Sequence, residues 1–360
     1  MSGEISFARG APSLDIIDVE GLQRAAAQAL AEDPGGATAY GTAVGYLPLR
    51  SWIAERHNVA PEQVIVTNGS MQADALLFER LVGEASEVIV ERPTYDRTLL
   101  ALSQRGARLQ AIDLAADGLE IGALEQLLAG GARPALAHVI PNFQNPAGCT
   151  LSREKREALL ALAERHDFMV FEDDPYAALS FSGEVPPTML SMAPERVTYA
   201  SSFSKTVCPG VRVGYLVGSE ELIGEITRLA TGTYISPNML AQAIVYRFCA
   251  GGALERSIER VRAALAERAK ALSEALCEAL PELDFNRPEG GYFLWARLPE
   301  GLDVEDLHRA AIERGVIFVK GTDFMLEGGE RHLRLAYSGV GIEQIRAGVG
   351  RLAEAWRSLR

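Results

Sequence analysis

Buried strands alternate with helices along the middle of the chain, between Val64 and about Gly218, and this alternation restricts the possible folds more than any other feature. Helical stretches at 73–81 and 152–166 separate short apolar runs that have the composition of buried strands: 64–67, 88–90, 135–140, 168–171 and 197–200. Such a chain forms a mostly parallel sheet with helices on both faces, because each parallel connection has to cross over the sheet. We therefore expect an α/β fold.

A long amphipathic helix from Leu254 marks the passage to a second, smaller domain. The part after it is typical of an α+β domain, with helices expected at 304–314 and 342–356 and strands at 292–298, 316–319 and 332–337. We predict three parts: an N-terminal arm with the first helix (1–30), a large domain (31–250) and a small C-terminal domain (251–360). The smaller α+β domain is expected to be built from the C-terminal part together with the N-terminal arm.

Length and charge exclude several classes of function. The 360 residues are enough for two domains, and the net charge of −13 argues against a nucleic-acid surface. The chain has no run of eighteen apolar residues, and its first residues lack the pattern of a signal peptide. We expect a cytoplasmic protein with no membrane partner and no metal site.

One lysine stands in an unusual context. The chain has only four lysines, and Lys205 follows a buried strand in a turn of small residues, with Ser202 and Ser204 before it and Arg212 after it. An amine in such a turn suits a Schiff base on a phosphorylated cofactor. An ordinary lysine at the end of a strand is the alternative, to which this stretch alone gives about equal weight.

The Ser-x-Ser-Lys sequence followed by Pro-Gly-x-Arg-x-Gly (202–205 and 209–214) resembles the lysine motif of the fold-type I pyridoxal-phosphate enzymes. The chain is similar to the class I/II aminotransferases, and within them to the branch of the 2-aminoadipate aminotransferases and the aminotransferase domain of MocR regulators. The resemblance extends from about Phe7 to the last helix, with several motifs in the expected order. It implies pyridoxal 5'-phosphate as cofactor and a homodimer with shared active sites.

A phosphate site is expected where the strand at 64–67 turns through Gly69 into a helix. Free backbone N–H groups and the positive end of the helix dipole meet there, at Ser70, Met71 and Gln72. The resemblance adds further phosphate ligands: Ser202, Ser204, Arg212 and, from the neighbouring subunit, Tyr40. A tyrosine that only packs is the alternative for Tyr40.

The remaining cofactor contacts are implied by motifs at the ends of later strands. In the family, Tyr95 corresponds to an aromatic residue stacked on the pyridine ring, and Asn145 and Tyr176 correspond to groups on its phenolic oxygen. Asp173 matches the aspartate that keeps the ring nitrogen protonated and makes the ring an electron sink. Lys205, Asp173 and Tyr95 are thus the expected catalytic residues. Asn142 is a weaker candidate than Asn145.

The substrate contacts implied by the resemblance are Arg334, Asn145 and Gly10. Arg334 matches the arginine that binds the substrate carboxylate, for which a two-pronged guanidinium is suited. The alternative is a solvated strand residue. Gly10, in the N-terminal arm, matches a glycine that lets the backbone of the arm approach the substrate, whereas Arg9 is better explained as a solvated side chain.

We predict a pyridoxal-phosphate-dependent aminotransferase that moves an amino group between an α-amino acid and a 2-oxo acid, with Lys205 as covalent anchor and proton carrier. Another reaction of the same cofactor, such as elimination, decarboxylation or oxidation, stays open because the cofactor supplies the chemistry. A ligand-sensing domain of a transcription regulator is the second alternative. It would need a basic helix-turn-helix before the fold, and few residues precede Phe7.

Overall fold

The computed structural model describes residues 3–360, and an eight-stranded sheet is its centre. Its strands are β2 (Val64–Thr67), β3 (Glu87–Arg92), β4 (Arg108–Ala115), β5 (Gly118–Leu119), β6 (Pro134–Val139), β7 (Met169–Asp173), β8 (Val197–Ser202) and β9 (Gly214–Val217). They lie in the order β2-β9-β8-β7-β6-β3-β4-β5. The five strands from β8 to β4 are parallel, whereas β9 and β5 run antiparallel to their neighbours. The expected mostly parallel sheet is confirmed.

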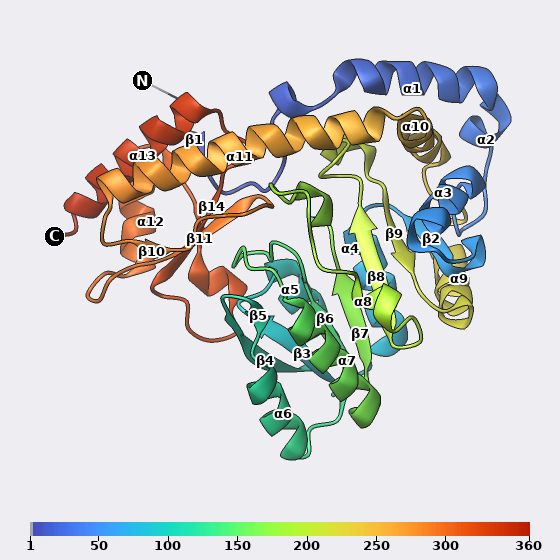
Figure 1. Cartoon of the computed structure of the whole chain (residues 1–360), viewed down its shortest axis with the longest axis horizontal. Coiled ribbons are helices and arrows are strands. Elements are labelled where there is room, and N and C mark those ends of the chain that lie inside the picture. Colours follow the sequence, from blue (N-terminus) through green and yellow to red (C-terminus); the bar gives the residue numbers. More distant parts are fainter. Residues whose placement is uncertain (1–2) are drawn as a thin grey trace.

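Helices cover both faces of this sheet (Figure 1). One face packs against α4 (Ser70–Leu81), α5 (Asp96–Gln104) and α9 (Glu220–Tyr234). The other carries α1 (Val19–Glu32), α2 (Pro34–Thr38), α3 (Leu47–His57), α6 (Ile121–Ala129), α7 (Arg153–His166), α8 (Met189–Met192) and α10 (Met239–Ala250).

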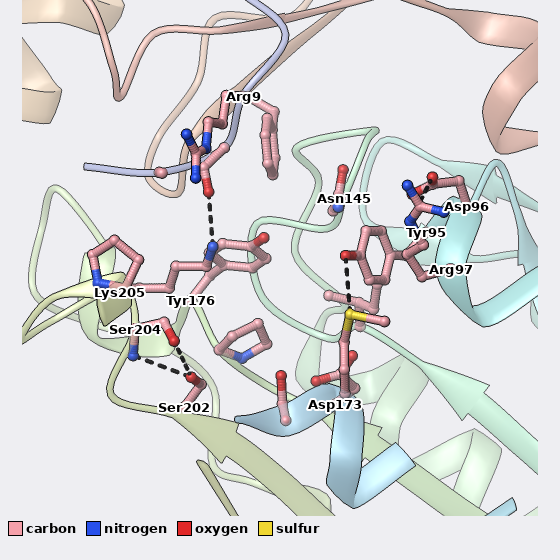
Figure 2. A pocket seen from close by; sticks show the side chains of 18 of the residues that line it. Arg9, Tyr95, Asp96, Arg97, Asn145, Asp173, Tyr176, Ser202, Ser204 and Lys205 are labelled. Atoms are coloured by element: carbon pink, nitrogen blue, oxygen red, sulfur yellow. Dashed lines mark hydrogen bonds and ion pairs between the residues drawn. The ribbon is translucent and has the colours of Figure 1, made fainter. Parts of the chain in front are cut away.

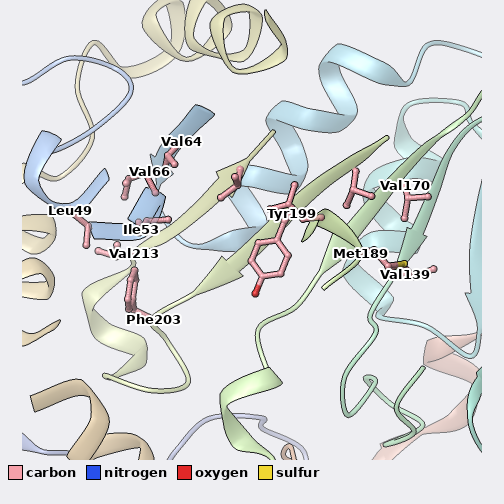
Figure 3. Close-up of a cluster of buried hydrophobic side chains, with 14 of the residues drawn as sticks. Leu49, Ile53, Val64, Val66, Val139, Val170, Met189, Tyr199, Phe203 and Val213 are labelled. Atoms are coloured by element: carbon pink, nitrogen blue, oxygen red, sulfur yellow. The ribbon is translucent and has the colours of Figure 1, made fainter. Parts of the chain in front are cut away.

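Side chains of the strands alternate between the two cores. Val64 and Val66 point into the core that Figure 3 shows, together with Tyr199, whereas Ile65 points to the opposite face. This alternation follows from the two-residue period of a strand. Both faces are buried, which explains the nearly continuous apolar runs in the sequence.

The C-terminal part forms a smaller α+β unit. The 27-residue helix α11 (Ala253–Ala279) leads to it along one side of the molecule (Figure 1). The unit contains α12 (Val304–Glu313), α13 (Ile342–Arg357) and an antiparallel sheet, in the order β10 (Asp284–Phe285), β11 (Phe293–Arg297), β14 (His332–Ala336) and β13 (Val319–Lys320). Five short 3-10 helices complete the fold: Leu14–Ile16, Pro61–Gln63, Ala177–Leu179, Pro209–Val211 and Gly321–Phe324.

The N-terminal arm joins this smaller unit. Strand β1 (Ile5–Ser6) pairs in parallel with β12 (Val316–Ile317), and Phe7 is fully buried in the same core as α11 and α13. Gly348 allows this contact, since a Cβ there would lie 2.6 Å from the Phe7 ring. The expectation that arm and C-terminal part build one unit is confirmed. The domain limits at residues 30 and 250 stay predictions.

Element boundaries differ from the predicted ones at a few places. Helix α4 begins at Ser70 instead of residue 73, because Gly69 is already its N-cap. The strand expected at 316–319 is divided into β12 and β13, which join different sheets. Within residues 3–360, no helix is long and apolar enough to cross a membrane, and no group of three or more His, Cys, Asp or Glu side chains is arranged to hold a metal ion.

The strand directions bring distant segments to one edge of the large sheet. The strands β2, β3, β6, β7 and β8 all end there, and ligand sites form outside such ends. Strand β9 begins at the same edge because it runs antiparallel, and Gly214 pairs with both Thr67 and Ser202. The loop 203–213, which contains Lys205, is therefore held beside the start of α4.

Candidate active site

A cavity of about 440 Å³ lies at this edge, between the sheet, the N-terminal arm and β14 (Figure 2). Twelve of the fourteen residues predicted from the sequence line it: Gly10, Ser70, Met71, Tyr95, Asn145, Asp173, Tyr176, Ser202, Ser204, Lys205, Arg212 and Arg334. Gln72 and Tyr40 do not.

The amine of Lys205 lies inside the cavity and donates to the backbone oxygen of Gly10 at 2.8 Å (Figure 2). The rings of Tyr176 and Tyr292 flank it, with centroids 5.9 and 5.3 Å from Nζ. Burial, followed by the positive charge of Arg334, lowers the pKa of this amine to about 8. Near neutral pH, a larger fraction of Lys205 than of an ordinary lysine is therefore unprotonated, which favours its action as a nucleophile or base.

Three segments form a cup for an anion. Ser202 and Ser204 are buried, and Ser202 donates to the Ser204 hydroxyl at 2.9 Å. Arg212 donates to Ser204 at 3.3 Å and to the Asn68 carbonyl at 3.4 Å. The first turn of α4 completes the cup, and no side chain caps that helix end. A positive side chain, hydroxyls and a helix N-terminus suit a phosphate group.

Two glycines make this cup possible by close backbone approach. Gly69 has φ +81°, and a Cβ there would lie 2.2 Å from the Arg212 guanidinium. A Cβ on Gly214 would lie 2.5 Å from the Ser70 backbone nitrogen. Arg212 itself has φ +49°, a strained conformation for a residue with a side chain, and such strain is concentrated at functional sites.

Asp173 ends β7 at the floor of the cavity, 5% exposed. Its Oδ1 is buried without a hydrogen-bond partner, and its Oδ2 lies 3.6 Å from Nε2 of the fully buried His138. A buried carboxylate oxygen without a partner is costly unless a ligand supplies one. A protonated pyridine nitrogen would do so.

Tyr95, Tyr176 and Asn145 form the walls above this floor. The hydroxyl of Tyr95 contacts the Met71 sulfur at 3.9 Å (Figure 2). Burial raises the pKa of Tyr95 to about 12 and also raises the pKa of Tyr176 above its usual value, so both side chains are neutral hydrogen-bonding groups. An aromatic face and two polar groups around a slot fit a substituted pyridine ring.

Arg334 enters the cavity from β14 and is 6% exposed. It donates to Asn145 Oδ1 at 2.8 Å and to the Ala8 carbonyl at 2.6 Å, while its Nε is buried without a partner. The ring of Phe293 lies 4.2 Å below the guanidinium. In the described part of the chain, neither Arg334 nor Lys205 forms an ion pair within 4.0 Å. The buried guanidinium is therefore available to an anionic ligand.

Gln72 and Tyr40 lie outside the cavity. The side-chain oxygen of Gln72 turns back and accepts from the Asn68 backbone N–H at 2.7 Å. The backbone N–H of Gln72 donates to the Gly69 carbonyl. Tyr40 is 88% exposed and lies beside Ser236, Pro237 and Asn238 on the surface. Of the weaker candidates, Arg9 lines the cavity and Asn142 does not.

Asn142 belongs instead to a buried network that supports the site. It donates to Asp174 at 2.9 Å and accepts from the fully buried Arg156 at 2.7 Å. Glu172 lies 3.6 Å from the same arginine and accepts from the backbone N–H groups of Met189 and Leu190. The two carboxylates that flank Asp173 are thus committed to structure.

Sequence reasoning missed four residues at or behind the cavity. Asp74 and Phe293 line it, Tyr292 donates to the backbone oxygen of Lys205 at 3.1 Å, and His138 supports Asp173. The ring of Phe293 explains why residue 10 is a glycine, because a Cβ at that position would lie 2.5 Å from the ring. Asp74 could have been noticed as a charge within the apolar face of α4, whereas nothing in the sequence distinguishes the other three from core residues.

The unpartnered oxygen of Asp173, the anion cup and the amine of Lys205 fit the nitrogen, phosphate and aldehyde of one molecule, pyridoxal 5'-phosphate. The fold and this site define a pyridoxal-phosphate-dependent enzyme of fold type I. The chain belongs to the aminotransferase class I and II family, whose model matches residues 3–352. It is an aminotransferase, which moves an amino group between an α-amino acid and a 2-oxo acid.

Named relatives support this membership. A 2-aminoadipate transaminase from Thermus thermophilus is 37% identical, over 99% of this chain and 91% of the relative. A crystal structure of an alpha-aminoadipate aminotransferase from Thermus thermophilus, complexed with N-(5'-phosphopyridoxyl)-L-leucine, has a TM-score of 0.94 at 36% identity, covering 99% of this chain and 93% of that one. The probable regulator MocR from Rhizobium meliloti is 32% identical, over 83% of this chain and 60% of the regulator.

The cup predicts that Gly214→Ala weakens cofactor binding. The added methyl group would meet the backbone of Gly69 and Ser70, which cannot yield as a flexible side chain could. Overpacking of this kind costs typically about 1–3 kcal/mol, or about 5- to 150-fold in Kd. Absorbance titration of apoenzyme with pyridoxal 5'-phosphate measures the change. Gly210→Ala, in the same loop but with no atom within 4 Å of the added Cβ, is the matched control. Equal affinities of both variants would contradict the cup.

Proposed function

We propose the following division of labour for the aminotransferase. Lys205 anchors the cofactor, Asp173 faces its ring nitrogen, Tyr95 stacks on the ring, and Asn145 and Tyr176 bind the phenolic oxygen. The phosphate is held by Ser202, Ser204, Arg212 and the first turn of α4, that is Ser70, Met71 and Gln72. Because the Gln72 N–H already donates to Gly69, its contribution is the weakest of the turn.

The bound cofactor supplies an electron sink for the bond that breaks at the substrate's α-carbon. Everything else comes from the chain. Lys205 Nζ takes the α-proton and returns it, a task suited by a pKa of about 8. Asp173 keeps a proton on the facing nitrogen, and Nε2 of His138 lies 3.6 Å behind that carboxylate. The arm residue Gly10 and the rings of Tyr176 and Phe293 exclude water from this exchange.

We propose that Arg334 binds the substrate's α-carboxylate. The observation that carries this proposal is the buried guanidinium with an unpartnered Nε and no carboxylate near it among residues 3–360. Asn145 would share the carboxylate, since its side-chain oxygen already orients Arg334 at 2.8 Å. Phe293 and Phe324, 4.2 and 4.7 Å from the guanidinium, keep its plane fixed.

Arg334→Lys tests this assignment. Lysine keeps the charge but loses the fork, and loss of one partner of a desolvated charged pair typically costs about 2–5 kcal/mol, or about 30-fold to several-thousand-fold. We expect kcat/KM for amino acids to fall by such a factor in steady-state assays. The absorbance spectrum of the bound cofactor and the activity toward amines without a carboxylate should be little changed. Arg331→Lys, in the turn before β14, is the control. Unchanged amino-acid kinetics in Arg334→Lys would reject the role.

We further propose a homodimer with shared active sites. Tyr40 is 88% exposed, its neighbour Gly41 donates to the Ser236 hydroxyl at 3.2 Å, and Ile235 next to this serine is also exposed. Leu240, which lies in the same surface hollow as Tyr40, is a further exposed apolar side chain. A surface of this kind is typical of an interface between copies. In the dimer, Tyr40 would reach the phosphate of the partner's cofactor.

Hybrid dimers test the shared site. If Lys205 and Tyr40 of different subunits meet in one site, mixing Lys205→Ala with Tyr40→Phe chains at equal amounts and allowing exchange restores one intact site in half of the dimers, so about a quarter of wild-type activity. Lys205→Ala mixed with Asp173→Ala is the control, because Lys205 and Asp173 both serve the site of their own subunit, so that every site in the hybrid lacks one of them. An active monomer in sedimentation experiments, or no recovery in the first mixture when both single variants are inactive, would contradict the proposal.

A further inference from the structure

A second buried carboxyl group faces the cavity besides Asp173. Asp74 lies in the second turn of α4, is 7% exposed and lines the same cavity. Its Oδ1 is buried and, in the part of the chain that the structure describes, has no hydrogen-bond partner. The mechanism above gives Asp74 no task, although a buried carboxyl oxygen without a hydrogen-bond partner is costly.

Asp74 and Asp173 line the same cavity. Burial and then the charge of Asp173 raise the pKa of Asp74 well above its usual range. A negative charge on one carboxyl group disfavours ionisation of another in the same poorly solvated cavity, which favours the protonated form of Asp74. Both residues line the cavity into which the cofactor ring would enter, and among residues 3–360 the Oδ1 of each is buried without a hydrogen-bond partner.

Other ionisable groups around the pair do not replace this proton. His138 stands behind Asp173, and Tyr95 borders the cavity from the start of α5. Glu91 of β3 is also buried, and burial raises its pKa to about 8, but it does not line the cavity and its Oε2 accepts from Gln144 and the Ile140 N–H. The cations Lys205, Arg212 and Arg334 also line the cavity, but among residues 3–360 none of them forms an ion pair with Asp74 or Asp173 within 4.0 Å. Asp74 is thus the proton-bearing carboxyl group that shares the cavity floor with Asp173.

We propose that Asp74 is a positioning residue that, paired with Asp173, carries the proton needed by the cofactor's ring nitrogen. In the apoenzyme the pair has one O–H bond and one negative charge. When the unprotonated ring enters, that O–H bond breaks and an N–H bond forms, leaving two carboxylates beside one pyridinium, so the total charge stays −1. No proton has to come from solvent. This inference rests on the proposed role of Asp173.

Proton counting tests the inference. Calorimetric titrations of apoenzyme with pyridoxal 5'-phosphate, in buffers of different ionisation enthalpy and above the pKa of the free ring nitrogen, give the number of protons taken up. We expect Asp74→Asn to take up about one proton more than wild type, and its log Kd to rise with pH by about one unit more per pH unit. Asp74→Ala should give the same difference, which separates proton storage from the shape of the side chain.

Two controls separate this inference from the proposed function. Asp96→Asn removes another carboxylate of the same cavity, one that pairs with Arg97 at 3.4 Å, and should leave the proton count at the wild-type value. A cofactor analogue with carbon in place of the ring nitrogen should abolish the difference between wild type and Asp74→Asn. Equal proton counts in these two proteins with normal cofactor binding would overturn the inference alone. A difference that persists with the analogue would show that the ring nitrogen does not face the pair, which would also reject the role of Asp173.

Discussion

Removal of water from the Lys205 amine is the physical condition on which the active site depends. In water this amine would be fully protonated and inert, whereas in the cavity burial and the charges of Arg334 and Arg212 lower its pKa to about 8. The shielding groups come from distant parts of the chain: the Gly10 carbonyl from the arm, and Tyr292 and Phe293 from the C-terminal unit. The reactive lysine therefore exists only when arm, large sheet and C-terminal unit are packed together.

The sheet topology provides the second condition, which is close approach of backbone to backbone. Strand β9 returns antiparallel between β2 and β8, so that Gly214 lies beside Thr67 and Ser202 at the edge where the other strands end. Because residue 214 is a glycine, β9 can approach the backbone at the start of α4. Because residue 69 is a glycine, the Arg212 guanidinium can lie directly against the backbone there. Anion cup and lysine are thus fixed by the same few backbone contacts.

Much of this arrangement could be predicted from the sequence, because the chemical residues follow strand ends and the strands are strongly apolar. Lys205, Asp173 and Tyr95 each follow or end a buried run, and parallel strand ends meet at one edge.

Asp74, His138 and Tyr292 could not be predicted in this way. His138 lies on a strand and Tyr292 directly before one, at positions where an ordinary core residue is equally plausible. Whether Asp74 faces the cavity depends on how α4 packs against the sheet. Gln72 does lie in the predicted helix turn, but that its side chain and N–H are bound locally depends on the conformation of Gly69.

We propose that one particular amine, made reactive by its surroundings, holds the cofactor. The chain has only four lysines, and the other three are engaged elsewhere: Lys155 with Asp117, Lys270 with Glu274 and Lys320 with Glu305. Borohydride reduction of the holoenzyme fixes the cofactor to the amine that binds it, and peptide mass mapping then identifies the lysine. The account predicts a phosphopyridoxyl group on Lys205 alone, absent from Lys205→Ala. A label on Lys155, Lys270 or Lys320 in the wild-type protein would contradict it.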